Sequence, residues 1–264
     1  MVLIRNLWSL HVWDHRERIA RLIFLGYVAL FPGSILSVAF GLVPPESRWF
    51  GGVLLMFQGV SLIAWLWNAI GRASLIPTAI IFVGSFAVEY IGATTDFPFG
   101  PYDYTAVLGY RVAGIVPMVI MFAWVMATYG AWMVASLLPF AQQHVTRGIL
   151  TGAIVALFDL QIEPVAVHIH GYWEWHASGL YYGVPAVNFL GWFVVGTIFS
   201  WCIDRPLRFA KDAGASRLPL LAIGGSCVMF LVMNGVAGHW AAMLLSVFSV
   251  GALVWIWRAA DRHL

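Results

Sequence analysis

The chain has 264 residues, of which 61% are hydrophobic and only 10% are charged, and its mean hydropathy is +0.85. These values lie outside the range of soluble globular domains and predict an integral membrane protein. The formal net charge of +2 gives no indication of a nucleic-acid partner. No repeat or long linker separates a second domain, so we expect one membrane domain over residues 1–264.

Eight apolar runs are long enough to cross a bilayer, because roughly 20 residues at a rise of 1.5 Å span the hydrocarbon core. In chain order the predicted spans are residues 21–43, 50–70, 76–93, 112–137, 149–168, 185–202, 217–234 and 239–258. The sequence "VMNGVAGHW" joins the last two. A tight turn there gives eight spans, which we favour, and a break within one helix gives seven. The expected fold is an all-α, polytopic transmembrane helix bundle.

The distribution of basic residues predicts the orientation of this bundle, since basic residues in short loops stay on the cytoplasmic side. With eight spans, the outer side receives only Arg48 and Arg111. The other side receives Arg5, Arg16, Arg18, Arg21, Arg72, Arg147, Arg205, Arg208, Lys211, Arg217, Arg258 and Arg262. We therefore expect a bacterial inner-membrane protein with both termini in the cytoplasm.

Three acidic residues fall within predicted spans: Glu89 in the third, and Asp159 and Glu163 in the fifth. An ionisable side chain at the bilayer centre costs on the order of 2.5–3.5 kcal/mol on insertion scales, so each needs a partner, a water cavity or a function. Asp159 and Glu163 are four residues apart and share one helix face. All three lie near the outer ends of their helices, and we expect no ionisable residue deep in the inner half. The alternative is a polar network that only ties helices together.

Two connections on the same outer side are rich in aromatic residues: "DFPFGPYDY" at 96–104 and "YWEWHASGLYYGVPAVNF" at 172–189. An interfacial aromatic belt would be scattered over several helix ends. Here the rings are concentrated in two loops, so we expect them to converge with the acids in an apolar cavity on the periplasmic side. Burial and a like-charged neighbour keep a carboxylic acid protonated, and such an acid can protonate an alkene. Aromatic faces would stabilise the carbocation by about 2 kcal/mol or more per ring, and water would capture it.

Other chemistries lack their motifs. There is no glycine-rich phosphate loop, no GxGxxG after a strand and no GxSxG elbow. His168, His170 and His176 do not form the repeated histidine clusters of membrane di-iron enzymes, so we expect hydrogen bonding there and no metal. We expect Asp103, Glu174 and His176 to be solvated loop residues.

Three segments together resemble the CruF-type carotenoid biosynthesis proteins, which are membrane hydratases acting on acyclic carotenoid ends. They are "EYIGATTDFPFGPYDYTAVLG" from Glu89, "FDLQIEPVA" around Asp159, and "GYWEWHASGLYYGVPAVNFLGW" from Gly171. The resemblance covers roughly residues 85–195. It implies a hydro-lyase of the carotenoid 1,2-hydratase type, which adds water across the terminal isoprenoid double bond without a cofactor and leaves a tertiary hydroxyl group.

Site residues are carried over on this resemblance. Glu89, Asp159 and Glu163 would form the acid cluster, with Asp159 as our first choice for the proton donor, and Asn188 would bind the water or the product hydroxyl. The polyene end and the cation would be lined by Tyr102, Tyr104, Trp173, Trp175, Tyr181 and Tyr182. The expected partners are a hydrophobic carotenoid or isoprenoid substrate and membrane lipids, and the oligomeric state is left open.

Two alternatives remain open at this stage. In an isoprenoid isomerase or cyclase, the same cation loses a proton or is attacked by a neighbouring double bond. In a proton-coupled transporter or a lipid-binding membrane protein, the three acids form a relay. A transporter should have paired broken helices in two repeats, whereas the sequence has one clear break, at Pro164, and its acids gather near one surface.

Overall fold

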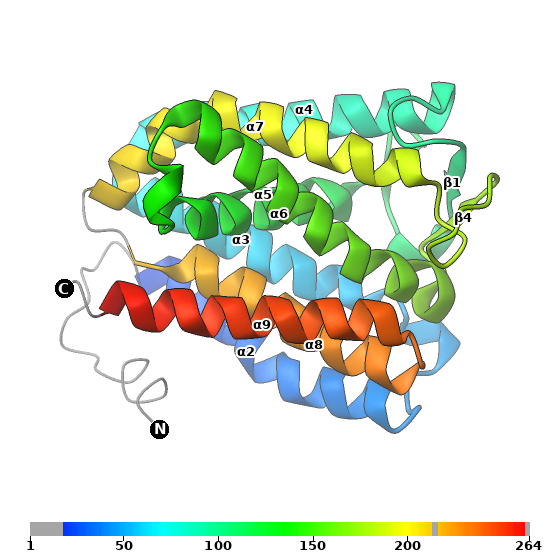
Figure 1. Cartoon of the computed structure of the whole chain (residues 1–264). Helices are drawn as coiled ribbons and strands as arrows, with labels where there is room; N and C mark the ends of the chain where they lie inside the picture. The colour runs from blue at the N-terminus through cyan, green and yellow to red at the C-terminus, as the bar shows by residue number, and fades with distance from the viewer. Residues whose placement is uncertain (1–17, 213–215, 262–264) are drawn as a thin grey trace.

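The computed structural model describes residues 18–212 and 216–261, and within them the chain forms a bundle of eight long α-helices (Figure 1). The helices are α2 (Arg18–Ala39), α3 (Phe50–Ile70), α4 (Leu75–Thr95), α5 (Met118–Ser136), α6 (His144–Pro164), α7 (Ala186–Asp212), α8 (Leu218–Val236) and α9 (Trp240–Asp261). Arg5, Arg16 and Arg262, which the orientation argument used, lie outside the described residues.

Short elements join the long helices. The 3₁₀ turns are η2 (Pro45–Ser47), η3 (Gly71–Ser74), η4 (Ala106–Leu108) and η5 (Pro139–Ala141), and a π-helix, η6 (Val165–His170), continues α6. The strands are β1 (Tyr102–Tyr104), β2 (Arg111–Val112), β3 (Val116–Pro117) and β4 (Trp173–Trp175). Strand β1 pairs with β4 and strand β2 with β3, both antiparallel.

The eight-helix prediction is confirmed. Helices α8 and α9 are separate and pack against each other, and a tight turn joins them at Gly238, whose φ of +76° suits glycine. Seven helical segments of the described chain are long and apolar enough to cross a membrane. One of them, Phe50–Thr95, is 46 residues long and contains both α3 and α4, which η3 joins. The alternative of one broken C-terminal helix is therefore wrong.

Two predicted helix boundaries are wrong. The fourth span begins at Met118 and not at residue 112, because residues 111–117 form the β2–β3 hairpin around Gly114, whose φ is +73°. The sixth span was expected to end at residue 202, but α7 continues to Asp212. Hydropathy follows contact with lipid, whereas the backbone hydrogen bonds of a helix continue beyond its apolar part.

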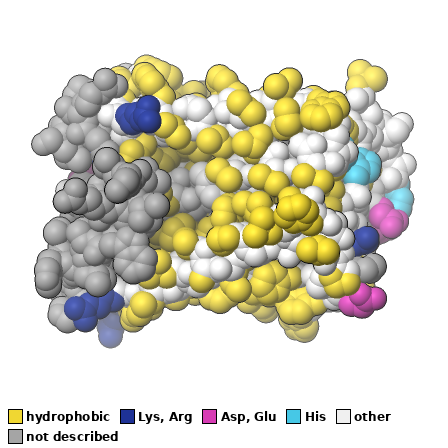
Figure 2. Space-filling view, turned by 90° about the horizontal axis from the view of Figure 1, so that it is seen from below, with side chains coloured by type: hydrophobic (Ala, Val, Ile, Leu, Met, Phe, Trp, Pro, Cys, Tyr) yellow, Lys and Arg dark blue, Asp and Glu magenta, His cyan; other side chains and the backbone are white. Residues whose placement is uncertain are grey.

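The surface fits a lipid environment. Large apolar side chains such as Leu25, Leu36, Ile76, Val83 and Phe248 are exposed along the helices, and in water this area would be unfavourable. Figure 2 shows one face of the molecule, with hydrophobic side chains along its middle and charged side chains at the two ends. Together with the long apolar helices, this identifies an integral membrane protein.

The two ends of the bundle differ. Strands β1 and β4 lie at one end, which we call the strand end, while α2 begins and α9 ends at the opposite end (Figure 1). Helix α5 lies in the middle of the bundle, with 16 of its 19 residues buried. It packs against α3, α4, α6 and α8. A helix that is apolar and buried on all sides has little freedom to rotate, so its side chains are held at fixed positions in the core.

Candidate active site

The two aromatic loops meet in the antiparallel pair of β1 and β4, with Tyr102 opposite Trp175 and Tyr104 opposite Trp173. Successive side chains of a strand point to opposite faces. The four rings therefore face the bundle, whereas the central pair, Asp103 and Glu174, is exposed. This pairing brings together two segments that are about 70 residues apart in the sequence. The expected convergence of the two loops is confirmed.

The tyrosines of β1 bind Glu89 on α4. The hydroxyl groups of Tyr102 and Tyr104 each donate to Glu89 Oε2 at 2.7 Å, and the indole N–H of Trp124 on α5 donates to Oε1 at 2.8 Å. Burial, and next the Glu89 carboxylate, raise the pKa of both tyrosines well above its ordinary value, so their hydroxyls keep their protons. Glu89 is only 4% exposed and accepts from three neutral donors. These three hydrogen bonds favour the charged form of the carboxyl group.

The tryptophans of β4 bind Glu163 on α6. Trp173 Nε1 and Trp175 Nε1 donate to Glu163 Oε2 at 3.1 and 3.0 Å. The Asn188 side chain on α7 bridges the two α6 acids, because its Nδ2 donates to Asp159 Oδ2 at 2.7 Å and to Glu163 Oε1 at 3.0 Å. Asp159, Glu163 and Asn188 are all buried, and Asp159 Oδ1 has no hydrogen-bond partner among the described residues.

A cavity of about 1110 Å³, including the space at its mouth, begins beneath the β1–β4 sheet. Its polar lining includes Glu89, Glu163 and Asn188, and its far part is lined by Gln58 on α3 and Ser226 on α8. Gln58 lies seven residues after the cavity residue Gly51, which corresponds to about 10 Å along α3. The cavity is therefore a deep, mainly apolar pocket with two carboxyl groups near one end.

The aromatic walls of this cavity come from several elements. Trp192 on α7 stacks on Trp124 with 4.2 Å between ring centroids and 13° between planes. Aromatic lining residues are Tyr27, Phe99, Tyr102, Tyr104, Tyr172, Trp173, Trp175, Trp192 and Phe230. Among the described residues, no lysine or arginine lines the cavity. A cation formed here would meet ring faces and carboxyl groups and no competing positive charge.

The structure brings most of the predicted site residues together and leaves three outside the cavity lining. Asp159 lies behind Asn188 and does not line the cavity. The Tyr181 hydroxyl donates to Leu160 O at 2.7 Å, and the Tyr182 hydroxyl accepts from Ala241 N at 3.1 Å. Both tyrosines thus hold the loop against α6 and α9, and their side chains do not line the cavity.

The sequence analysis did not identify Trp124 as a hydrogen-bond donor to Glu89. The residue lies in an apolar span, where a tryptophan is usually interpreted as a packing residue. A buried indole N–H needs a hydrogen-bond acceptor, and this requirement could have indicated a polar partner for Trp124. His170, Tyr172 and Trp192 also line the cavity and were not predicted to do so. His176 and Asp103, which bond to each other at 2.8 Å, are exposed as expected.

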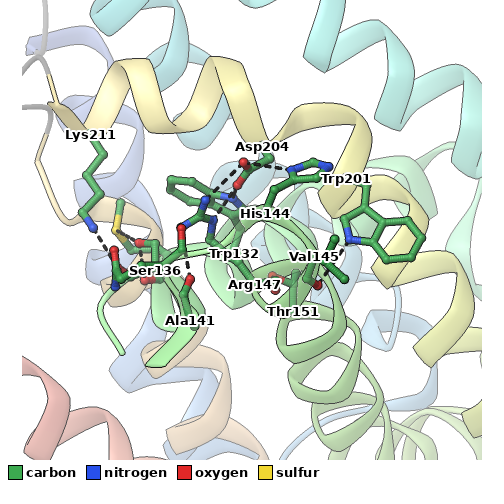
Figure 3. A network of polar contacts seen from close by, with 12 residues as sticks. Trp132, Ser136, Ala141, His144, Val145, Arg147, Thr151, Trp201, Asp204 and Lys211 are labelled. Carbon is green, nitrogen blue, oxygen red and sulfur yellow. Dashed lines mark hydrogen bonds and ion pairs between the residues drawn. The ribbon is translucent and has the colours of Figure 1, made fainter. Parts of the chain in front are cut away.

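A second polar network at the opposite end corrects one expectation (Figure 3). Arg147 on α6 pairs with Asp204 on α7 through Nε and Nη2, and the Trp132 indole donates to the same carboxylate at 2.8 Å. Arg147 is 2% exposed and Asp204 is 3% exposed. The expectation that no ionisable residue lies in this half of the bundle is therefore wrong, because α7 extends beyond its apolar part.

The same network ties three helices together. His144 Nδ1 lies 3.1 Å from Asp204 Oδ2, and Lys211 Nζ donates to Ser136 O on α5 at 2.7 Å. The network removes one argument against the transporter alternative. Its residues do not line the cavity, however. Arg147 and Asp204 neutralise each other and are both hydrogen-bonded, as expected for an ion pair that holds helices together.

Comparison with known proteins gives two matches. The profile of a family described as "Carotenoid biosynthesis protein" matches residues 50–253. Bisanhydrobacterioruberin hydratase of Haloarcula japonica is 28% identical over 182 residues, which are 65% of this chain and 61% of the relative. The chain thus spans less than two thirds of the length of that relative. No solved structure matches.

Proposed function

Because the chain belongs to the carotenoid biosynthesis protein family, we propose that it is a hydratase that adds water across the terminal isoprenoid double bond of an acyclic carotenoid end. The relative's name describes a hydratase. The observation that carries the proposal is the position of Glu89 and Glu163 in one aromatic, mainly apolar cavity. Two carboxyl groups suffice for the reaction, one to give a proton to carbon and one to take a proton from water.

Glu163 is the proton donor in this mechanism, because it lines the cavity and Asp159, the donor favoured from the sequence, does not. Asp159 and Glu163 share a single neutral bridge, Asn188, so the pair holds one proton in place of two buried negative charges. In the reactive state this proton is on Glu163, and Asp159 is the charged member of the pair, which accepts from Asn188 Nδ2.

Proton transfer then proceeds from Glu163 to the less substituted alkene carbon. The C=C π electrons form the new C–H bond, and the positive charge remains on the carbon that bears two methyl groups. The Glu163 carboxylate left behind keeps three N–H donors, from the two indole groups and from Asn188 Nδ2. Donors already aimed at the developing charge lower the barrier to its formation.

Water capture completes the reaction. The faces of Trp173, Trp175 and Trp192 stabilise the tertiary cation while a water oxygen forms the C–O bond. The attacking water then loses its proton to the Glu89 carboxylate, which Tyr102 and Tyr104 hold in place. The product is a tertiary alcohol, one water is consumed, and proton exchange returns the two carboxyl groups to their starting states.

Turnover by the full-length protein in membranes tests the proposal. The test substrates are bisanhydrobacterioruberin and lycopene, a carotenoid hydrocarbon with two acyclic ends. We expect a product heavier by one water, with its oxygen derived from labelled water, in the absence of oxygen gas and reductant. A product that forms only when oxygen gas is supplied, with its oxygen derived from that gas, would indicate a hydroxylase, and a product of unchanged mass would indicate an isomerase or cyclase. Either result would overturn the proposal.

Variants in deuterated water separate the two carboxyl roles. Glu163→Gln should lose both hydration and deuterium uptake into recovered substrate, by roughly 10²–10⁴-fold, because it cannot give a proton. Glu89→Gln should lose hydration but keep deuterium uptake, because the cation still forms and returns to alkene. Asp103→Asn, the same change at an exposed acid of β1, is the matched control and should behave as wild type.

The proposed orientation places the strand end on the periplasmic side of a bacterial inner membrane and both termini in the cytoplasm. The unequal distribution of arginine and lysine supports it. In a chain whose native cysteines are replaced, Asp103→Cys should react with a membrane-impermeant thiol reagent in intact cells, whereas Arg72→Cys should not. The reverse labelling pattern would contradict this orientation.

A further inference from the structure

A second cavity lies beside the active-site cavity at the strand end. It has about 420 Å³ of empty space, including its mouth, between the end of α2 and the π-helix η6. Its lining residues are Val38, Gly41, Val43, Arg48, Ile169 and His170. His170 lines the active-site cavity as well. This one side chain therefore belongs to the walls of both spaces.

His170 is buried, and its Nδ1 has no hydrogen-bond partner among the described residues. Its ring stacks on Tyr172 with 4.9 Å between centroids and 13° between planes. The Tyr172 hydroxyl donates to the backbone oxygen of Arg48 at 3.0 Å, which holds the stacked pair between the two cavities. A buried polar atom without a partner calls for an explanation, and an ordered water is the usual one.

The proposed reaction needs water at a place that water does not reach easily. The walls of the active-site cavity are mainly apolar, and the rings of β1 and β4 cover its strand end. The side-chain donors near the carboxyl groups are already engaged with Glu89 and Glu163. Hydration consumes one water in every turnover, so the site requires both an entry for water and a polar group to receive it.

We propose that the second cavity is the water entry of the enzyme and that His170 is the residue that receives water there and positions it toward the cation. This inference rests on the proposed hydratase function. The received water forms the C–O bond with its lone pair, and its proton leaves to the Glu89 carboxylate. His170 is the last residue of the π-helix that ends α6, and π-helical turns occur frequently at functional sites.

The first test replaces the ring nitrogens while keeping the stacked ring. His170→Phe should lower the hydration rate at least tenfold with little change in KM for lycopene, and deuterium uptake into recovered substrate should persist, because protonation is intact while capture fails. His170→Asn, which restores a polar group, should recover much of the hydration rate. His168→Phe, at an exposed histidine of the same π-helix, is the control and should behave as wild type.

The second test fills the entry without touching the active-site cavity. Val43 lines the second cavity and does not line the active-site cavity, so Val43→Trp should reproduce the loss of hydration with retained deuterium uptake. Normal hydration by both His170→Phe and Val43→Trp would overturn the inference. If His170→Phe lost both hydration and deuterium uptake, the inference would also be overturned, because His170 would then be needed for protonation. A wild-type protein that forms no hydrated product would instead refute the proposed function itself.

Discussion

The Asn188 bridge allows the sharpest prediction about the acid pair. Asn188→Leu keeps a side chain of similar size but removes the only donor to Asp159 Oδ2 and one of three donors to Glu163 among the described residues. A hydrogen bond to a charged group contributes about 1.5–3 kcal/mol. Losing one such bond from the carboxylate that forms during proton transfer should therefore lower kcat roughly 10- to 150-fold.

The assay measures kcat and KM for hydration in proteoliposomes, together with the thermal unfolding of each variant. KM should change little, because Leu still fills the space beside the cavity and the substrate is apolar. Asn234→Leu is the matched control, since Asn234 is also a buried amide that donates to an acceptor on α6, Gln161 O at 3.0 Å, but does not line the cavity.

The control should lower the unfolding temperature while leaving kcat near the wild-type value. If Asn188→Leu also kept a wild-type kcat, the bridge would have no part in proton transfer, and the shared-proton reasoning would be refuted. If both variants lost activity in proportion to their stability, the effect of Asn188→Leu would be structural. Only a fall in kcat that exceeds the control's supports the mechanism.

Three further changes test other parts of the structure. Trp175→Phe removes one indole donor from the α6 carboxyl group in the cavity and should lower kcat about tenfold, which turnover assays measure. Arg147→Met leaves the buried Asp204 without its cation and should destabilise the bundle by about 3–5 kcal/mol, measured by unfolding, while the folded fraction keeps its kcat. Gly51→Ala places a Cβ onto the Tyr172 hydroxyl and should lower the unfolding temperature, whereas the double variant with Tyr172→Phe should be more stable than Gly51→Ala alone, because the remaining ring carbon lies at 3.4 Å.

The sequence predicted the helices well because a bilayer allows few spanning structures. All backbone polar groups must be satisfied within each segment, so apolar runs of sufficient length become helices. The errors occurred at the ends, where α5 begins after the β2–β3 hairpin and α7 continues past Cys202 into polar sequence. For this reason Asp204 fell just outside the predicted sixth span, although it is a buried residue of α7.

The acid cluster was predictable in part. Acidic residues are rare within apolar spans, and this identified Glu89, Asp159 and Glu163. Their positions along the predicted helices placed them at one end of the bundle. Which acid faces the cavity depends on the rotation of α6 and on the side chain of Asn188, and neither follows from spacing. Trp124 was missed because its role arises only when α4 and α5 pack together.

The side chains of β1 and β4 specify the register of this antiparallel pair. If one strand slid along the other by a single residue, Asp103 or Glu174 would turn inward and the neighbouring rings would turn outward. The misaligned chain would then place an extra unpaired carboxylate against an apolar interior and strip Glu89 or Glu163 of its donors. Mispairing is thereby penalised twice, and short strands of only three residues can still find one alignment.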